Sequence, residues 1–321
     1  MKIIYMGTPD FAVAPLEAIL KAGHEVTAVV TQPDRQKGRG REVQYSPVKE
    51  CALSYGIPVL QPLKIKEEDA VEELRKYPAD IFVVAAFGQL LSEEILNMPR
   101  LGCINIHASL LPAYRGAAPI QWCVINGEEK TGVTIMQMAK GMDTGDILLQ
   151  KEVVLDEKET GGSLFDRLME TGAELIVEVL PKIEAGELTP VVQKEELATY
   201  AGKITKDMGN IDFAKSAVTI ERLIRGLNPW PSAFTHYKGK ILKIWEADVV
   251  SECANAENPV PGTVIAMDKE SFTLATGEGA LRIRSLQPEG KKRMSCAEFM
   301  LSLIHTPSPR DPKTSRMPSS A

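Results

Sequence analysis

Asn105 and His107 lie two residues apart in the stretch GCINIHASLLPAYRGAAP, residues 102–119. In an extended strand the side chains alternate between the two faces, so this pair shares one face and Ile104 and Ile106 share the other. An amide that donates and accepts, beside an imidazole that titrates near neutral pH, can hold and polarise a carbonyl group. The pattern therefore predicts a site that stabilises an oxyanion, as in acyl transfer. The alternative is a buried polar pair that only closes the strand.

Asp143 is the next residue with catalytic potential, because it stands in the stretch GMDTGD between Gly141 and Gly145. An aspartate flanked by glycines is by itself typical of a tight turn. If the turn folds back beside His107, the carboxylate can orient the imidazole, and Asp146 is the alternative for that role. The chain has no GxSxG motif, and His107 has no partner at a metal-ligand spacing. We therefore expect neither a serine nucleophile nor a metal.

A run of basic residues occupies the stretch RQKGRGR, namely Arg35, Lys37, Arg39 and Arg41. The two glycines indicate a flexible loop, which either stays a solvated surface loop or contacts phosphates and bases and orders on binding. The net charge of the chain, −6, argues only weakly against a nucleic-acid partner, because the part from Thr205 onward is mildly basic.

The elements that must position these residues alternate between apolar strands and helices in the first part of the chain. This order predicts an α/β fold with a Rossmann-like, open, mostly parallel sheet covered on both faces. Ligands of such sheets bind at the carboxyl ends of the strands, where Asn105 and His107 lie. The first strand-to-helix turn carries only Gly7 and no GxGxxG motif, which disfavours a dinucleotide and a dehydrogenase. We expect strands at 2–6, 24–32, 57–62, 79–88 and 103–109 and helices at 8–23, 48–56, 67–77 and 92–98.

A second domain follows an amphipathic helix expected at 161–186 and a connecting arm. A helix that stops at Pro229 precedes five short strand-like pieces separated by turn signals, a pattern that predicts a small OB-like β-barrel. From His305 the chain is rich in Pro and Ser, which predicts disorder. The expected bounds are a catalytic domain at 1–189, a linker at 190–205, the barrel domain at 206–304 and a disordered tail at 305–321.

The bulk composition indicates a class of protein. A chain of 321 residues is long for one hydrophobic core, and 44% apolar with 25% charged residues is typical of soluble globular proteins. Apolar runs stay below the ~18 residues of a membrane span, and the start MKIIYMGTPDF fits a strand better than a signal peptide. We expect a cytoplasmic protein without a membrane partner, and a monomer. The 5 cysteines form no CxxC pair, which predicts reduced core thiols rather than disulfides or a zinc site.

The motifs resemble those of the folate-dependent formyltransferase family over nearly the whole chain. The resemblance rests on GTPDFA, TQPDRQKGRG, SPVK, RLGCINIHASLLPAYRGAAPIQ, TGVTIMQMAKGMDTGD, NPWP and LQPEGKKRM. INIHASLLP with a downstream MDTGD is a specific signature of formyl transfer. The basic loop, NPWP and the last motif favour the branch that acts on methionyl-tRNA. The resemblance implies that 10-formyltetrahydrofolate, as co-substrate, gives its formyl group to the α-amino group of initiator methionyl-tRNA for the initiation of translation.

The resemblance also assigns residues by position. The family's catalytic residues match Asn105, His107 and Asp143. A folate-contacting turn of the family matches Ser109, Leu110, Leu111 and Pro112. The loop that contacts tRNA matches Arg35, Lys37, Arg39 and Arg41. The second domain is expected to help hold the acceptor arm, whereas the tail after KKRMSCAEFM departs from the family's amphipathic ending.

Two other functions remain open from the sequence alone. An enzyme with the same formyl donor can act on a different amine, such as a nucleotide-linked amino sugar. The basic loop and the match over the whole length count against it. A catalytically silent tRNA-binding protein is the second alternative, but it has no need of the intact set Asn105, His107 and Asp143.

Overall fold

The computed structural model describes residues 1–37, 42–250 and 259–304. The chain divides into two compact units, of which the first spans Met1–Ile204 and the second begins at Thr205. The expected disordered tail, 305–321, lies outside the described residues.

The segment 190–205, for which the sequence predicts a linker, belongs mostly to the first unit. Val191 forms an antiparallel bridge with Ile147, and strand β11 (Tyr200–Ala201) pairs with strand β8 (Arg115–Gly116). Pairings of one or two residues leave no hydrophobic period in the sequence, which is why the pattern alone suggests a connecting arm. The domain bounds given above stay a prediction.

The first unit is built on a seven-stranded sheet, and its central strands are apolar throughout because both faces are covered. In β6, for example, the residues IFVVA are all buried. The five strands from β7 to β5 run parallel, and β9 and β10 add an antiparallel edge. The predicted mostly parallel sheet is thereby confirmed. The order across the sheet is β10 (Ile147–Val154), β9 (Lys130–Gln137), β7 (Cys103–His107), β6 (Ile81–Ala85), β1 (Lys2–Gly7), β2 (Glu25–Val30) and β5 (Val59–Leu60).

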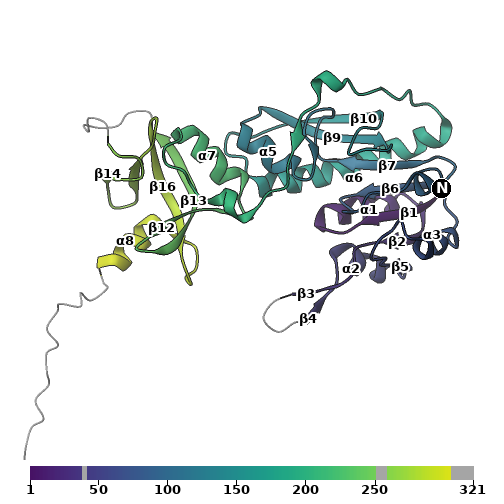
Figure 1. The fold of residues 1–321 in the computed structure, drawn as a ribbon, viewed down its shortest axis with the longest axis horizontal. Helices are drawn as coiled ribbons and strands as arrows, with labels where there is room; N and C mark the ends of the chain where they lie inside the picture. Colours follow the sequence, from purple (N-terminus) through teal and green to yellow (C-terminus); the bar gives the residue numbers. More distant parts are fainter. Residues whose placement is uncertain (38–41, 251–258, 305–321) are drawn as a thin grey trace, which may run out of the picture. The chain divides into compact units, whose positions relative to one another are not determined.

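Helices lie on both faces of this sheet (Figure 1). Along β1, Ile3 and Tyr5 belong to one hydrophobic core, and Ile4 and Met6 belong to the other. The elements packed on the first core are η1 (Asp10–Ala12), α1 (Val13–Lys21), α2 (Pro47–Ser54), α5 (Pro119–Asn126) and α6 (Gly161–Ala185). The second core is covered by α3 (Glu68–Arg75) and α4 (Glu93–Leu96).

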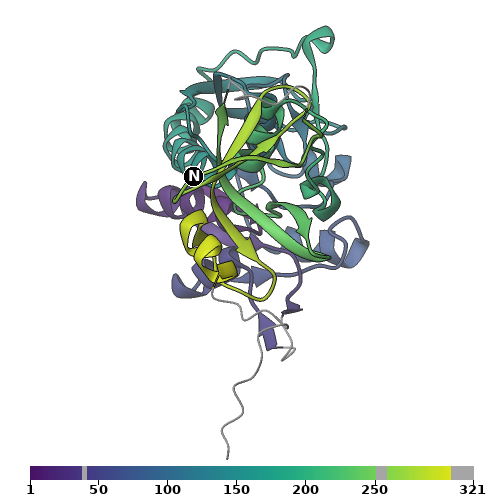
Figure 2. The same cartoon turned by 90° about the vertical axis from the view of Figure 1, so that its left-hand side faces the viewer.

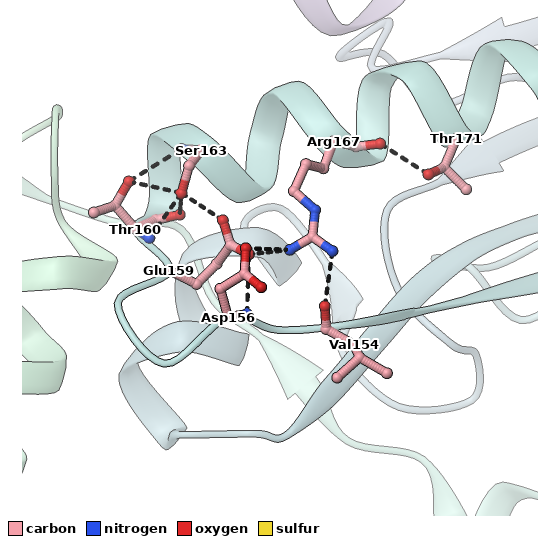
Figure 3. A network of polar contacts seen from close by, with 7 residues as sticks. All are labelled: Val154, Asp156, Glu159, Thr160, Ser163, Arg167 and Thr171. Carbon is pink, nitrogen blue, oxygen red and sulfur yellow. Dashed lines mark hydrogen bonds and ion pairs between the residues drawn. The ribbon is translucent and has the colours of Figure 1, made fainter.

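Polar contacts fix the start of α6 to the end of β10 (Figure 3). Ser163 N donates to Thr160 Oγ1 at 3.0 Å and Thr160 N donates to Ser163 Oγ at 2.9 Å, which forms a capping box. The Glu159 side chain, only 2% exposed, pairs with Arg167 and accepts from Ser163 Oγ at 2.5 Å. Arg167 also donates to the carbonyl of Val154 at 2.8 Å. One buried carboxylate therefore organises this junction.

We expect Glu159→Gln to lower the free energy of unfolding by about 1.5–3 kcal/mol, because the charge-assisted hydrogen bonds of a buried carboxylate are lost. Urea unfolding of the two proteins measures the difference. Glu178→Gln is the matched control, because it removes an exposed carboxylate that pairs with Lys182 on the same helix. Such a surface pair contributes about 0.3–0.5 kcal/mol. Equal effects of the two substitutions would contradict a structural role of the Glu159 cluster.

The second unit is an antiparallel sheet packed against helices, seen from a second side in Figure 2. Its hydrophobic core joins residues of the sheet, such as Leu281 and Ile283, to Ile220 and Ile224 of α7 and to Phe299 of α8. The sequence predicts a small OB-like β-barrel here, and the structure confirms a small β domain built on an antiparallel sheet after the α/β unit. Its elements are η3 (Lys206–Gly209), α7 (Ala217–Gly226), β12 (Ala233–Tyr237), β13 (Lys240–Val250), β14 (Val264–Met267), β15 (Phe272–Ala275), β16 (Ala280–Pro288), β17 (Met294–Ser295) and α8 (Cys296–Ile304).

The cysteines within the described residues, at positions 51, 103, 123 and 296, are free and buried, as expected of core thiols. Burial raises the pKa of Cys103 to about 12 and that of Cys123 to about 11, so both stay protonated at neutral pH. Cys253 lies outside the described residues. None of the helices that the structure describes is long and apolar enough to cross a membrane.

Candidate active site

A cavity of about 610 Å³ lies at the carboxyl ends of β1, β6 and β7. The chain places β2 and β5 on one side of β1 and places β6 and β7 on the other, so the strand order reverses here. Open α/β sheets bind their ligands at such a switch point. The segments that line the cavity follow directly on these strands and include Phe11, the loop 86–90 and Ala108.

Asn105, His107 and Asp143 all line this cavity. Asn105 and His107 stand on β7 with exposed fractions of 9% and 6%. Ile104 and Ile106 belong to the core on the opposite face, as the alternation along a strand requires. The structure therefore brings together the three residues that the sequence predicts for the site, although they come from segments almost forty residues apart.

The imidazole of His107 has a defined orientation. Its Nε2 lies 3.0 Å from the carbonyl oxygen of Tyr114. A carbonyl only accepts, so this geometry assigns the hydrogen to Nε2. The other ring nitrogen, Nδ1, lies 3.7 Å from Asp143 Oδ2, which is too long for a direct hydrogen bond. Nδ1 is thus the nitrogen that is available to exchange a proton with Asp143 or a bound substrate.

The GMDTGD turn settles which aspartate faces His107. Asp143 has a left-handed backbone, with a φ of 55°, and its Oδ2 accepts from the backbone N–H of Gly116 at 2.8 Å. Asp146 instead uses its backbone carbonyl, which accepts from Gln137 N at 2.8 Å within the β9–β10 hairpin. A Cβ atom at Gly145 would lie 1.7 Å from the carbonyl oxygen of Gln137, so this close approach needs glycine.

None of the four residues of the turn from Ser109 to Pro112 lines the cavity. Ser109 and Leu111 are 1% and 3% exposed. Thr134 Oγ1 donates to Ser109 O at 2.6 Å and accepts from Leu111 N at 3.1 Å, which ties the turn to β9. The contact of Ser109, Leu110, Leu111 and Pro112 with a folate stays a prediction.

Residues 86–90 form a loop after β6 and line the cavity. The expected strand at 79–88 is therefore too long at its end, because β6 stops at Ala85. Ala86 and Gly88 have φ angles of 46° and 85°. The carbonyl of Phe87 accepts from Thr8 Oγ1 and Gln32 Nε2, each at 3.1 Å, which holds the loop against the strands β1 and β2. The available signal is Gly88, three residues after a wholly apolar strand, at the sheet edge where ligands bind.

The basic stretch begins in a short hairpin of β3 (Arg35–Lys37) and β4 (Glu42–Gln44). Arg39 and Arg41 lie outside the described residues. Lys49 Nζ donates to Asp34 Oδ2 at 2.6 Å, and Gln61 Nε2 donates to Asp34 Oδ1 at 2.8 Å. The hydrogen bond from Lys49 lowers the pKa of Asp34, so the carboxylate that anchors the base of the hairpin stays charged.

Comparisons with known proteins identify the family. The family model "Formyl transferase" matches residues 1–180, and "Formyl transferase, C-terminal domain" matches residues 203–303. The methionyl-tRNA formyltransferase of Lachnospira eligens is 56% identical over 302 residues, which is 94% of this chain and 96% of that protein. The chain belongs to the methionyl-tRNA formyltransferase family. The enzyme of that name from Clostridioides difficile is 48% identical over 300 residues, again 94% of this chain and 96% of its own length.

Solved structures show the formyltransferase fold. HypX from Aquifex aeolicus in complex with tetrahydrofolic acid has a TM-score of 0.64 at 18% identity over 95% of this chain. This chain spans about half of that protein, 48% of its length. The N-formyltransferase from Helicobacter canadensis, in complex with folinic acid and dTDP-3-aminofucose, has a TM-score of 0.67 at 20% identity, over 92% of this chain and 100% of that one. At these identities the likeness establishes the fold alone.

Membership of the formyltransferase family confirms the resemblance drawn from INIHASLLP and MDTGD. The roles of the individual residues stay predictions, because no comparison tests them one by one. In the part of the chain that the structure describes, no group of three or more His, Cys, Asp and Glu side chains is arranged to hold a metal ion.

Proposed function

We propose that this chain transfers the formyl group of 10-formyltetrahydrofolate to the α-amino group of initiator methionyl-tRNA. The observation that carries this proposal is the meeting of Asn105, His107 and Asp143 in one cavity of a methionyl-tRNA formyltransferase family member. Formyl transfer needs an aligned amine, donors for an oxyanion and a route for one proton, and the three side chains supply groups for each.

The cavity suits a folate. Its volume of about 610 Å³ lies within the range of roughly 300–1,000 Å³ that is usual for small-molecule sites. Phe11, Phe87 and Met136 contribute apolar walls, and the polar side chains gather where β7 ends. We assign the apolar part to the ring system of the folate and the polar part to its formyl group.

The mechanism begins with an amine that needs little activation. A free α-amino group has a pKa of about 7.7–8.0, and esterification to the tRNA lowers it, so a large fraction of the amine is neutral at pH 7. Its nitrogen attacks the formyl carbon, and the carbonyl electrons move to the oxygen. Asn105 donates from its amide to this oxyanion, and His107, when protonated at Nδ1, donates as well.

The collapse of the tetrahedral intermediate breaks the bond between the formyl carbon and the folate nitrogen. The attacking amine loses one proton and the leaving nitrogen gains one. Asp143 lies 3.7 Å from His107 Nδ1, a distance that leaves room for transfer by way of a bound water or the substrate amine. We assign this proton transfer to Asp143 and His107 together.

Two features of the chain support a tRNA as the amine carrier. The basic stretch RQKGRGR holds Arg35, Lys37, Arg39 and Arg41, and arginine and lysine are the residue types that commonly contact phosphates. In the second unit, the ring of Trp245 lies 5.3 Å from the Arg293 guanidinium and 5.7 Å from Lys243 Nζ. An aromatic ring among cations is typical of surfaces on which nucleic-acid bases stack.

A formyl-transfer assay with 10-formyltetrahydrofolate tests this function. The three acceptors are methionylated initiator tRNA, methionylated elongator tRNA and a nucleotide-linked amino sugar. We expect formylation of the initiator alone. The sugar is included because the neighbour from Helicobacter canadensis was solved with dTDP-3-aminofucose. Formylation of the sugar instead would keep the formyl-transfer chemistry and refute the tRNA substrate.

Arg39→Ala is expected to raise the KM for methionyl-tRNA by roughly 10-fold, because one arginine contact to a nucleic acid is worth about 1–3 kcal/mol. The slow hydrolysis of 10-formyltetrahydrofolate in the absence of tRNA should stay unchanged. Lys182→Ala is the charge-matched control, since this lysine pairs with Glu178 on the surface of α6. An equal loss of both activities in Arg39→Ala would indicate misfolding, whereas an unchanged KM for methionyl-tRNA would refute the contact.

A further inference from the structure

We propose that Gln193 is a positioning residue for Asp143 and that Gln193, Glu195 and strand β11 form a structural support of the active site. This inference rests on the proposed function, because it concerns the aspartate to which we assign proton transfer. It departs from the sequence, which predicts a linker in this region.

The Gln193 side chain, in a residue that is 8% exposed, reaches the GMDTGD turn directly. Its Nε2 donates to the carbonyl oxygen of Asp143 at 2.8 Å and to that of Gly145 at 2.6 Å. Its Oε1 accepts from Arg115 Nε at 3.0 Å. Carbonyls only accept and a guanidinium only donates, so the network fixes which end of the amide faces which partner. Gln193 thus uses both hydrogens of its amide group on the catalytic turn.

Arg115 holds the other end of this amide. It is 1% exposed, and its Nη1 donates to both carboxylate oxygens of Glu195 at 2.8 and 3.0 Å. The backbone of Arg115 is also held in place, because β8 pairs with β11. A buried guanidinium with these partners is rigid, because any movement leaves a buried charge unpaired. The orientation of Gln193 is therefore set by the fold and not by solvent.

Hydrogen bonds hold both the side-chain carboxylate and the backbone carbonyl of Asp143. Its carboxylate accepts from the N–H of Gly116, and its own carbonyl accepts from Gln193, whose amide is bonded to Arg115, the residue before Gly116. A left-handed backbone is uncommon for a residue that is not glycine, so hydrogen bonds from outside the turn help to keep this conformation. Loss of the Gln193 donors would release the backbone of Asp143 and move its carboxylate away from His107.

Gln193→Glu isolates this role. The carboxylate keeps an acceptor for Arg115 but has no N–H for the carbonyls of Asp143 and Gly145. We expect kcat to fall on the order of 100-fold, as for other small misplacements of catalytic groups, while the KM values for both substrates change by less than about threefold. Val192→Glu is the matched control, because it puts the same new side chain one residue away at a position that is 73% exposed. It should leave kcat unchanged.

A double-mutant cycle separates positioning from a general loss of structure. If Gln193 acts through Asp143, Gln193→Glu should lower kcat by less than about threefold in an Asp143→Asn background. The same 100-fold loss in both backgrounds, or no loss in either, overturns the inference. A wild-type protein that forms no formyl-methionyl-tRNA instead refutes the proposed function.

Amide hydrogen exchange tests the support without any substrate. In Gln193→Glu the amides of residues 141–146 should exchange about tenfold faster than in the wild-type protein, and those of the second unit should not change. Unchanged exchange in the turn overturns the inference, whatever the activity of the enzyme.

Discussion

Asn105→Ala is expected to lower kcat for the formylation of methionyl-tRNA by about 100- to 1000-fold, the usual loss when one oxyanion donor is removed. The amide stands on β7, an interior strand of the sheet, and lines the cavity. It donates most strongly when charge develops on the formyl oxygen, so its removal affects the transition state more than the bound folate. The Kd for a folate analogue should therefore change by less than roughly threefold.

Single-turnover kinetics and equilibrium binding of the analogue measure these two quantities. Asn97→Ala serves as the control, because it truncates an exposed asparagine at the end of α4, outside the cavity lining. Unchanged turnover in Asn105→Ala would refute the oxyanion role. A parallel loss of folate affinity would show that the amide only binds the ground state.

Asp143→Asn is expected to lower kcat by about 1000-fold, within the range of roughly 100- to 10,000-fold that general acid–base catalysis contributes. The substitution preserves an oxygen that accepts from the N–H of Gly116, so the turn keeps this bond. It replaces the carboxylate beside His107 Nδ1, which can accept a proton, by a neutral amide that cannot. The bound geometry stays close to that of the wild type while the proton route is lost.

The pH profile of kcat in the wild-type protein and the variant measures this loss. Asp146→Asn is the internal control, since the interaction of Asp146 with Gln137 uses its backbone and survives the substitution. It should change kcat by less than about threefold. A large loss in Asp146→Asn with little loss in Asp143→Asn would reverse the assignment of the two aspartates.

Features that depend on local spacing follow from the sequence alone. Alternation along CINIH places Asn105 and His107 on one face, and the buried strands of the first unit read as apolar runs because helices cover both faces. The expected helix at 161–186 begins at a capping Thr160 and ends at Gly186, signals that lie within a few residues of its ends. The family signature likewise lies in continuous stretches of chain.

Contacts between groups that are distant along the chain depend on the tertiary structure. The approach of Asp143 to His107, the burial of Ser109 and Leu111 and the wall formed by residues 86–90 depend on how β6, β7 and the β9–β10 hairpin pack. The hydrogen bond between the side chains of Arg115 and Gln193 joins residues that are 78 positions apart in the chain. Periodicity reports only the face that a residue presents to its own element, whereas these contacts arise between elements. A segment that reads as a linker therefore became part of the active-site support only when the chain folded.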